Sequence, residues 1–337
     1  MSAAYEKWPA LIETFWGRLD PWASLVVFMA GSALMIWRLG ALEGKGFEGT
    51  VLGTLIMPYC SGVSNLIFAF VMGRSGGSGR LVLENCLVNN VTNMTLLVGL
   101  PAMIWTLDLF PGANGRSRSA PRRKDYRLNR LSLLLTITAM LFFTGVTWAL
   151  AQDRKLDFSD GLVLVAVFLF WQVFHVFEVL KTNLQRNRAM PASLVVDLMA
   201  ILAGGVAVYL SIDRMVAWVS TSGRGILVFD NLGWLSGLLM VLPNALLAFW
   251  YARAGRADVV YSSQVGDGHI CIPMCIGMFA LFTPVAIPAA MLPGLWIIAA
   301  AGVIHFGFLA VGGRLPRWAG ALLTGAYFFF LYKGFIT

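Results

Sequence analysis

Two stretches of the chain carry polar side chains of the kinds that hold cations. Asn85, Asn89 and Asn93 recur at every fourth position, so a helix through them places three carboxamides on one face. Amide and carboxylate oxygens are the ligands that hard cations prefer. We therefore predict a cation site with Asp267 as its charged ligand, whereas hydrogen bonding between packed helices is the competing interpretation of the asparagines. Asp267 ends a second polar run that also contains Ser262, Ser263 and Gln264.

Composition places these polar residues in a membrane protein. Hydrophobic residues make up 58% of the 337 and charged residues 12%, with a mean hydropathy of +0.74. Soluble domains have roughly 45–50% and 25%. A polar group inside hydrocarbon is costly unless it is paired or faces a cavity. The asparagine face and Asp267 are therefore expected to point toward protein or water.

Ten apolar runs are candidates to cross a bilayer, which takes about 20 residues each. The predicted fold class is an all-α integral membrane protein of about ten transmembrane helices. The expected spans are 22–40, 49–73, 82–106, 131–152, 160–180, 191–212, 232–252, 259–283, 293–313 and 317–336.

Positive charges divide unequally between the two sides that ten spans define. The odd-numbered connections carry 16 of the 25 Lys and Arg residues, and segment 108–130 alone holds seven. By the positive-inside rule, 108–130 is a cytoplasmic loop and both termini lie outside. We expect an integral plasma-membrane protein, in the inner membrane if the source is bacterial. Since topology accounts for the charge of +8, lipid is an expected partner and nucleic acid is not, while the loop could also bind anionic lipid or a protein.

The chain divides into a short N-terminal segment and two halves. Residues 1–21 mix charged residues with Trp and Leu, so they lack the apolar core of a signal peptide and predict an interfacial amphipathic helix. Five spans fall in 22–190 and five in 191–337. An odd number per half gives the halves opposite orientations, which is typical of transporters built from inverted repeats.

Irregular features recur at matching places in the two halves. The second and seventh spans are rich in Gly and interrupted by Pro, and the third and eighth begin with polar residues. Interrupted helices at corresponding positions indicate a binding site near the middle of the membrane. The residues expected to shape the breaks are Gly53, Pro58, Pro243 and Gly266.

This paired pattern resembles the two alpha-repeats of the sodium/calcium exchanger superfamily of cation antiporters. Each repeat of that family has a Gly-Thr-Ser-x-Pro-Glu-like segment, followed by a Gly-Asn/Asp…Gly-Ser-Asn-like segment. The first is matched here by Gly53-Thr54-Leu55-Ile56-Met57-Pro58-Tyr59 and by Met240-Val241-Leu242-Pro243-Asn244. The second is matched by Glu84-Asn85…Val88-Asn89-Asn90…Asn93 and by Gly266-Asp267…Cys271. The similarity covers the four repeat helices and, in outline, the remaining spans.

The resemblance implies a secondary active transporter with alternating access around a midplane site, where Asn85 and Asp267 match the Asn and Asp of the family. The chain departs at Tyr59 and Asn244, where the family has glutamates that coordinate Ca²⁺. Because Ca²⁺ takes about six to eight oxygens including several carboxylates, we expect a Na⁺- or H⁺-coupled cation antiporter, with no cofactor besides the coupling ion. The expected ion-binding residues are Asp267, Asn85, Asn89, Asn244, Tyr59, Ser263, Thr54 and Glu84.

Other interpretations stay open. Replacement of both glutamates is also expected of a non-transporting membrane subunit that kept the scaffold and works with a membrane-protein partner. Asp267, Cys271 and Cys275 follow one another at intervals of four, and a carboxylate with two thiols suits a transition metal. An exchanger with altered selectivity, for such a metal or for an organic solute, is therefore a further hypothesis. The competing interpretation of the cysteines is that they are small apolar residues that allow close helix packing. Glu84 also has two interpretations: it binds the ion, or it lies at the membrane interface and only begins its helix.

Motifs of soluble catalysis are missing from the sequence. It has no Gly-rich phosphate loop followed by Lys, no nucleophile elbow and no HExxH. We therefore do not expect an enzyme, and transport would be driven by ion gradients.

Overall fold

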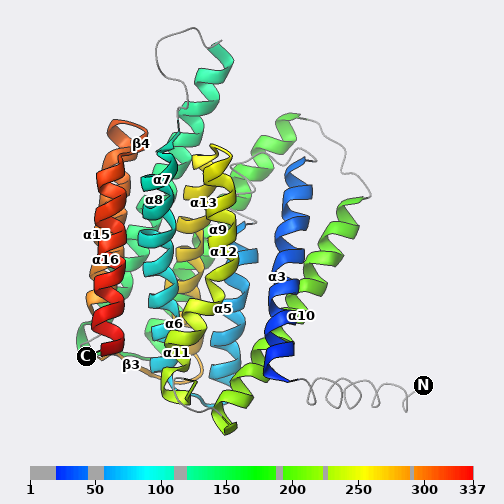
Figure 1. Cartoon of the computed structure of the whole chain (residues 1–337), viewed down its shortest axis with the longest axis vertical. Coiled ribbons are helices and arrows are strands. Elements are labelled where there is room, and N and C mark those ends of the chain that lie inside the picture. The colour runs from blue at the N-terminus through cyan, green and yellow to red at the C-terminus, as the bar shows by residue number, and fades with distance from the viewer. Residues whose placement is uncertain are drawn as a thin grey trace.

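The computed structural model describes residues 20–44, 57–109, 120–186, 193–222, 227–288 and 292–336. Within these ranges the helices form ten rods that run side by side, so the predicted all-α architecture is confirmed (Figure 1). The rods are α3 (Pro21–Gly44), α5 (Met57–Arg74), α6–η2–α7 (Gly79–Val91, Thr92–Leu96, Leu97–Trp105), α8 (Ala120–Leu150), α9 (Phe158–Arg186), α10 (Ser193–Ser222), α11–α12 (Leu232–Met240, Leu242–Arg253), α13–η5–α14 (Ala257–His269, Ile270–Cys275, Ile276–Ala280), α15 (Leu292–Val311) and α16 (Arg317–Ile336).

The outer surface of the bundle is apolar, and several polar side chains are buried inside it. Large apolar side chains such as Phe170 and Trp250 are 76% and 73% exposed, whereas Asn89, Asn93 and Asp267 are fully buried. By length and composition, six of the described helical segments can cross a membrane. An apolar exterior is what a bilayer favours, because lipid is the solvent.

Several boundaries differ from the predicted ones. Residues 120–130 of the expected loop 108–130 form the first turns of α8, since this Arg- and Lys-rich stretch consists largely of good helix formers. α10 continues ten residues beyond its predicted end, to Ser222. The N-terminal segment up to residue 19 and residues 45–56, which include Gly53 and Thr54, lie outside the described residues.

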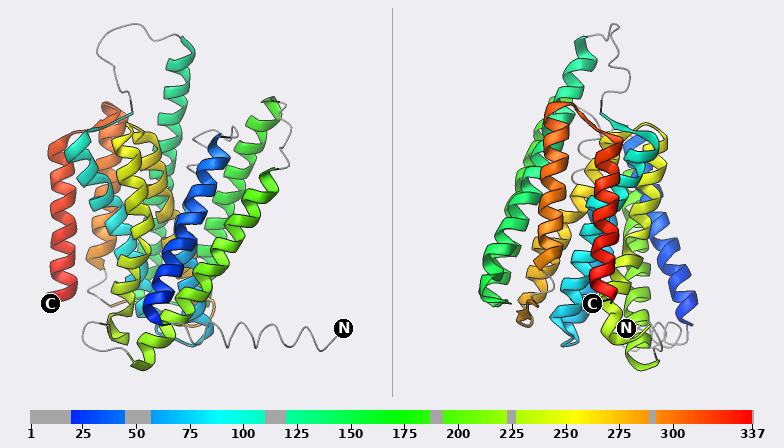
Figure 2. Two further views of the ribbon diagram at one scale, coloured as in Figure 1. Left: turned by 45° about the vertical axis from the view of Figure 1, so that its right-hand side comes forward. Right: turned by 60° about the vertical axis from the view of Figure 1, so that its left-hand side comes forward.

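Two short antiparallel strand pairs connect the halves. β1 (Leu107–Asp108), which follows α7, pairs with β4 (Arg314–Leu315), which precedes α16. β3 (Val285–Ala286), which follows α14, pairs with β2 (Lys155–Leu156), which precedes α9. The last helix of each half therefore packs against the third helix of the other half, as α16 does beside α7 in Figure 2.

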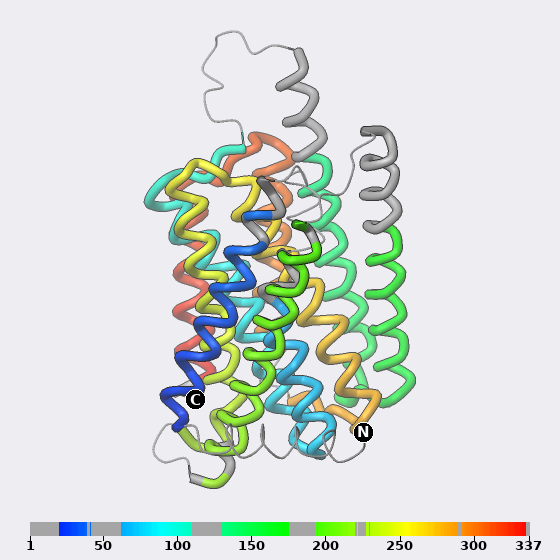
Figure 3. The backbone as a smooth tube through the Cα atoms, turned by 90° about the vertical axis from the view of Figure 1, so that its right-hand side faces the viewer, coloured from blue at the N-terminus to red at the C-terminus, as the bar shows by residue number. Residues whose placement is uncertain are grey.

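α3 and α10 pack mainly against each other at the right-hand edge of the bundle in Figure 1, the side that faces the viewer in Figure 3. Gly31 and Gly204 let the two backbones approach, because a Cβ on Gly204 would lie 2.9 Å from the Gly31 carbonyl oxygen. Arg38 and Asp197 add an ion pair across the contact, with Nη1 and Oδ1 3.6 Å apart. The pair meets the rest of the bundle chiefly through α5.

Candidate functional site

The carboxylate of Asp267 lies at the centre of the described polar cluster. The residue is fully buried in the last turn of α13. Its Oδ2 atom accepts hydrogen bonds from Nδ2 of Asn93, at 2.6 Å, and from Nδ2 of Asn244, at 3.1 Å. Hydrogen bonds to an ionised acceptor are short and strong. Two amide donors from η2 and α12 therefore hold this buried carboxyl group from two sides.

Further carboxamides extend the cluster through both halves of the chain. Asn93 Nδ2 also donates to Asn89 Oδ1, at 2.8 Å. Gln264 donates through Nε2 to Ser263 Oγ, at 3.0 Å, and to the carbonyl oxygen of Asn244, at 3.4 Å. Amide and hydroxyl oxygens in this arrangement supply neutral ligands beside one carboxylate.

Matching π-helical segments lie beside the cluster in the two halves. A 13-residue α-helix precedes each of them: α6 comes before η2, and α13 comes before η5. Asn89 and Asp267 are both the eleventh residue of their helix, so they occupy equivalent places in the two repeats. Single π turns within α-helices frequently lie at functional sites.

The π segments alter the local hydrogen bonding of the backbone. In η2, the Met94 carbonyl oxygen is 2.7 Å from Nε2 of His305 on α15. In η5, Pro273 has no N–H to donate. A similar contact is made by His269, two residues after Asp267: its Nε2 atom is 2.8 Å from the Thr136 carbonyl oxygen. Both histidines thus support neighbouring helices by contacts with backbone carbonyls.

α5 approaches the carboxylate with bare backbone. A Cβ placed on Gly62 would lie 2.9 Å from Asp267 Oδ1 and 3.0 Å from Ile270 Cδ1. These distances are shorter than nearly all Cβ contacts in proteins. Only glycine at position 62 therefore lets Asp267 Oδ1 lie where it does. Asp267 therefore receives contacts from α5, η2 and α12, drawn from both halves.

The structure brings together only some of the predicted residues. Asn89, Asn244 and Ser263 join the Asp267 cluster directly or through one neighbour. Asn85 lies elsewhere, because its Nδ2 donates to Ser236 Oγ at 3.0 Å and to Met240 Sδ at 3.4 Å, on α11.

Glu84 is also not among the described residues that contact Asp267. Its Oε1 is 2.9 Å from Nε of Arg80, one turn earlier on the same helix. Glu84 is nevertheless only 3% exposed, so it does not merely mark the helix start at an interface.

The predicted helix breaks have mixed outcomes. The rod of α11 and α12 is interrupted at Val241, just before Pro243, as expected. At Gly266 the prediction is wrong, because α13 continues through it to His269 and the irregular turn begins only at Ile270. A lone glycine weakens a helix without having to end it. Pro58 and Tyr59 fall in the first turn of α5, and their side chains lie outside the described part, as do Gly53 and Thr54.

Two site residues were absent from the predicted binding set. Asn93 makes the shortest described hydrogen bond to Asp267, and Gln264 joins Ser263 to Asn244. The signal for Asn93 was present in the four-residue spacing from Asn89. The spacing could not show which of the three asparagines on that face reaches α13.

The three cysteines whose side chains the structure describes lie next to the cluster. Cys86, Cys271 and Cys275 are free, fully buried thiols whose side chains contact one another where α6 meets η5. Among the described residues, no group of three or more His, Cys, Asp or Glu side chains is placed to hold a metal ion. The packing interpretation of these thiols is therefore the one that the described contacts support.

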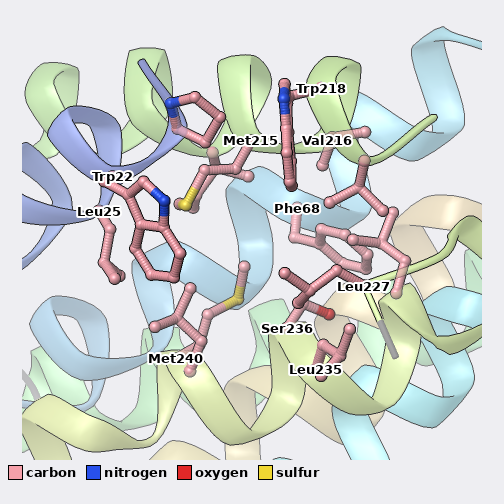
Figure 4. A pocket seen from close by; sticks show the side chains of 15 residues that line it. Trp22, Leu25, Phe68, Met215, Val216, Trp218, Leu227, Leu235, Ser236 and Met240 are labelled. Atoms are coloured by element: carbon pink, nitrogen blue, oxygen red, sulfur yellow. The ribbon is translucent and has the colours of Figure 1, made fainter. Parts of the chain in front are cut away.

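A separate apolar cavity of about 250 Å³ lies where α3, α10 and α11 diverge (Figure 4). Its walls include Trp22, Phe68 and Met215, and on the α11 side they include Ser236 and Met240, which also contact Asn85. The apolar walls make this cavity unsuitable for a bare cation.

Comparisons with known proteins agree with this architecture. Residues 22–177 match the family model described as "Sodium/calcium exchanger protein". A structure of the sodium-calcium exchanger NCX_Mj soaked with zero Na⁺ and Ca²⁺ has a TM-score of 0.66 at 14% identity and covers 92% of this chain and 96% of that chain. A second structure of NCX_Mj, soaked with Na⁺ and Sr²⁺, has a TM-score of 0.64 at 15% identity and covers 95% and 97%. The comparison with curated proteins gives no match. At such identities the structural likeness shows a common fold.

Proposed function

We propose that the chain is a Na⁺- or H⁺-coupled cation antiporter of the sodium/calcium exchanger superfamily, and that it binds its ion at Asp267. The observation that carries this proposal is a fully buried carboxylate held by amides from both halves of the bundle. An ionisable residue within a membrane bundle indicates an ion or proton pathway, because its burial is otherwise costly.

The charge of the cluster favours a monovalent ion over Ca²⁺. Asn244, at a position where the resemblance expects a glutamate, contributes an amide N–H to Asp267. Ca²⁺ is dehydrated at a protein site only when several anionic oxygens replace its water. A single negative charge with amide and hydroxyl oxygens is instead sufficient for Na⁺, or for a proton on the carboxylate itself.

The amides give the site a way to hold its charge before and after binding. Without a cation, the N–H groups of Asn93 and Asn244 stabilise the carboxylate. Rotation of a carboxamide about its last bond exchanges its nitrogen and oxygen, so the same side chains can turn an oxygen toward a bound cation. Asp267 thereby remains paired in both conditions.

Alternating access follows from the inverted repeats in this proposal. Equivalent helices, each with a π segment, meet at the site from opposite directions. Two related conformations of such repeats can open the site to one side or the other, with the cation changing their relative populations.

Transport by purified protein in liposomes tests the proposal. We expect an imposed Na⁺ or H⁺ gradient to drive movement of a second cation, and Asp267→Asn to abolish it. Asp258→Asn is the matched control, because Asp258 is on the same helix but pairs with Arg256, with Oδ1 and Nε 3.1 Å apart. Undiminished exchange by Asp267→Asn would remove this residue from its proposed role.

A non-transporting membrane subunit is the second candidate, and one observation favours it. The Asp267 carboxylate already has two amide donors, and these hydrogen bonds stabilise it in the fold without a bound ion. The two candidates differ in a measurable way: a subunit should purify with a stoichiometric membrane partner and show no cation-dependent change in thermal stability. A cation-dependent stabilisation that Asp267→Asn removes would exclude it.

A further inference from the structure

α6 and α11 meet in a close seam at the end of the bundle where α16 finishes (Figure 1). A Cβ on Gly233 would lie 2.5 Å from Oε2 of Glu84, and a Cβ on Gly237 would lie 2.9 Å from the Asn85 carbonyl oxygen. We call this contact the α6–α11 seam, made by Glu84, Asn85, Gly233, Ser236 and Gly237. Because two of its α11 residues lack side chains, oxygen atoms of α6 face α11 directly.

The seam contains buried acceptor atoms without a donor. Oε2 of Glu84 and Oδ1 of Asn85 are both buried and have no hydrogen-bond partner among the described residues. Oδ1 of Asn244, beside Asp267, is in the same condition. A buried acceptor costs free energy unless a donor or a cation meets it. The three oxygens therefore define places where a passing cation would be stabilised.

At Glu84, the outermost of these places, the positive charge is supplied by Arg80. Its Nε atom pairs with Glu84 Oε1, and its Nη2 atom donates to the Asp230 carbonyl oxygen at 3.2 Å, in η4 (Phe229–Asn231). The guanidinium thus links α6 of one half to the segment before α11 of the other. Its side chain is 51% exposed, whereas that of Glu84 is 4% exposed, so Arg80 lies between the carboxylate and the surface.

We infer that Glu84 is the access carboxylate of a monovalent-cation route along the α6–α11 seam to Asp267, and that Arg80 occupies it as a tethered cation until a free ion displaces it. The inference rests on the proposed function, since it supplies that site with a path. Asn89 lies five positions after Glu84, or about 7.5 Å further along the helix, and it is linked to Asp267 through Asn93. With the predicted topology, the route opens to the outside.

Charge substitutions test the route in liposomes with one protein orientation. Removing the carboxylate in Glu84→Gln should raise the KM for Na⁺ added at the seam side by about tenfold. The KM at the opposite side and the maximal rate should change by less than about twofold. Arg80→Gln should lower the KM at the seam side, because the competing charge is gone. Arg256→Gln, which removes a similar ion pair at the start of α13, should leave the seam-side KM unchanged.

Equal changes in KM at both sides, or no change in Glu84→Gln, would overturn the inference. Glu84→Asp keeps the charge and should retain the seam-side KM within about threefold. A thermal melt in detergent separates loss of folding from loss of ion access in each variant.

A chemical label tests the route without any transport. Ser236→Cys places a thiol in the seam next to Asn85, and the parent chain gives the background reaction of its native cysteines. A cationic methanethiosulfonate should modify this thiol at least about tenfold faster than an anionic one, and Glu84→Gln should remove the preference. Equal rates for both reagents would refute the route even if exchange at Asp267 holds. Lack of exchange with an intact preference would refute the proposed function alone.

Discussion

Nδ2 of Asn93 lies 2.6 Å from Oδ2 of Asp267, across 174 positions of the chain. The bond joins η2 of the first half to α13 of the second, at the turns where both third helices depart from regular α geometry. A single hydrogen bond thus couples the conformation of one repeat to the charge held by the other.

Replacement of Asn93 by Leu should weaken both the fold and ion binding, because Asp267 then loses its shortest described donor. Leaving a buried polar group without its partner costs about 1–3 kcal/mol, and more if the group is charged. Thermal melts in detergent measure the stability and liposome uptake measures the KM. In an Asp267→Asn background the same replacement should cost less, and equal costs in both backgrounds would show that the two residues are not coupled.

Gly62→Ala should lower cation affinity without removing any polar group. The added methyl would lie 2.9 Å from Asp267 Oδ1, so the carboxylate or α5 must move. Overpacking of this kind costs about 1–3 kcal/mol. Gly145→Ala on α8 is the control, because its Cβ would meet nothing within 4 Å. Titration of Na⁺ against thermal stability should show weaker binding for Gly62→Ala only.

Na⁺ or a change of pH should shift the melting temperature of the purified chain. A ligand that binds only the folded state stabilises it by about 2.7 kcal/mol when present at 100 times its Kd. Asp267→Asn should abolish the shift, whereas Asp258→Asn should keep it. A screen over Na⁺, K⁺, Ca²⁺, Mn²⁺, Zn²⁺ and pH that yields no shift would favour the subunit candidate.

Asn244→Asp should make divalent ions stabilise the chain more than monovalent ions do. It places a second carboxylate where Asn244 Nδ2 now lies 3.1 Å from Asp267 Oδ2. Two carboxylates so close cannot both be ionised without a cation, so the variant should be less stable than the parent in a chelator. Added Ca²⁺ should restore stability, because it gains the anionic oxygens that it prefers. Equal stabilisation by K⁺ and Ca²⁺ would contradict this account.

The sequence predicted the rods of the bundle better than the contacts between them. The lengths of the apolar runs and the break before Pro243 depend only on neighbouring residues, so the sequence was sufficient to predict them. The π segments could not, because an extra residue in a helical turn leaves no distinct pattern. The spacing of Asn85, Asn89 and Asn93 showed a shared face but not their depth along it, so it could not correct the resemblance, which placed Asn85 at the ion. The pairing of Glu84 with Arg80 was readable from their spacing of four residues.

The exchange of partners between the halves has a consequence for biosynthesis. Gly99 on α7 packs so close to α16 that an added Cβ would lie 2.7 Å from the Gly320 carbonyl oxygen, yet the two glycines are 221 positions apart. At about 5–20 residues per second, the ribosome supplies α16 roughly 10–45 s after α7. During that interval the face of α7 must be covered by lipid, by the insertion machinery or by another helix. Neither half can therefore complete its native packing before the last helix has entered the membrane.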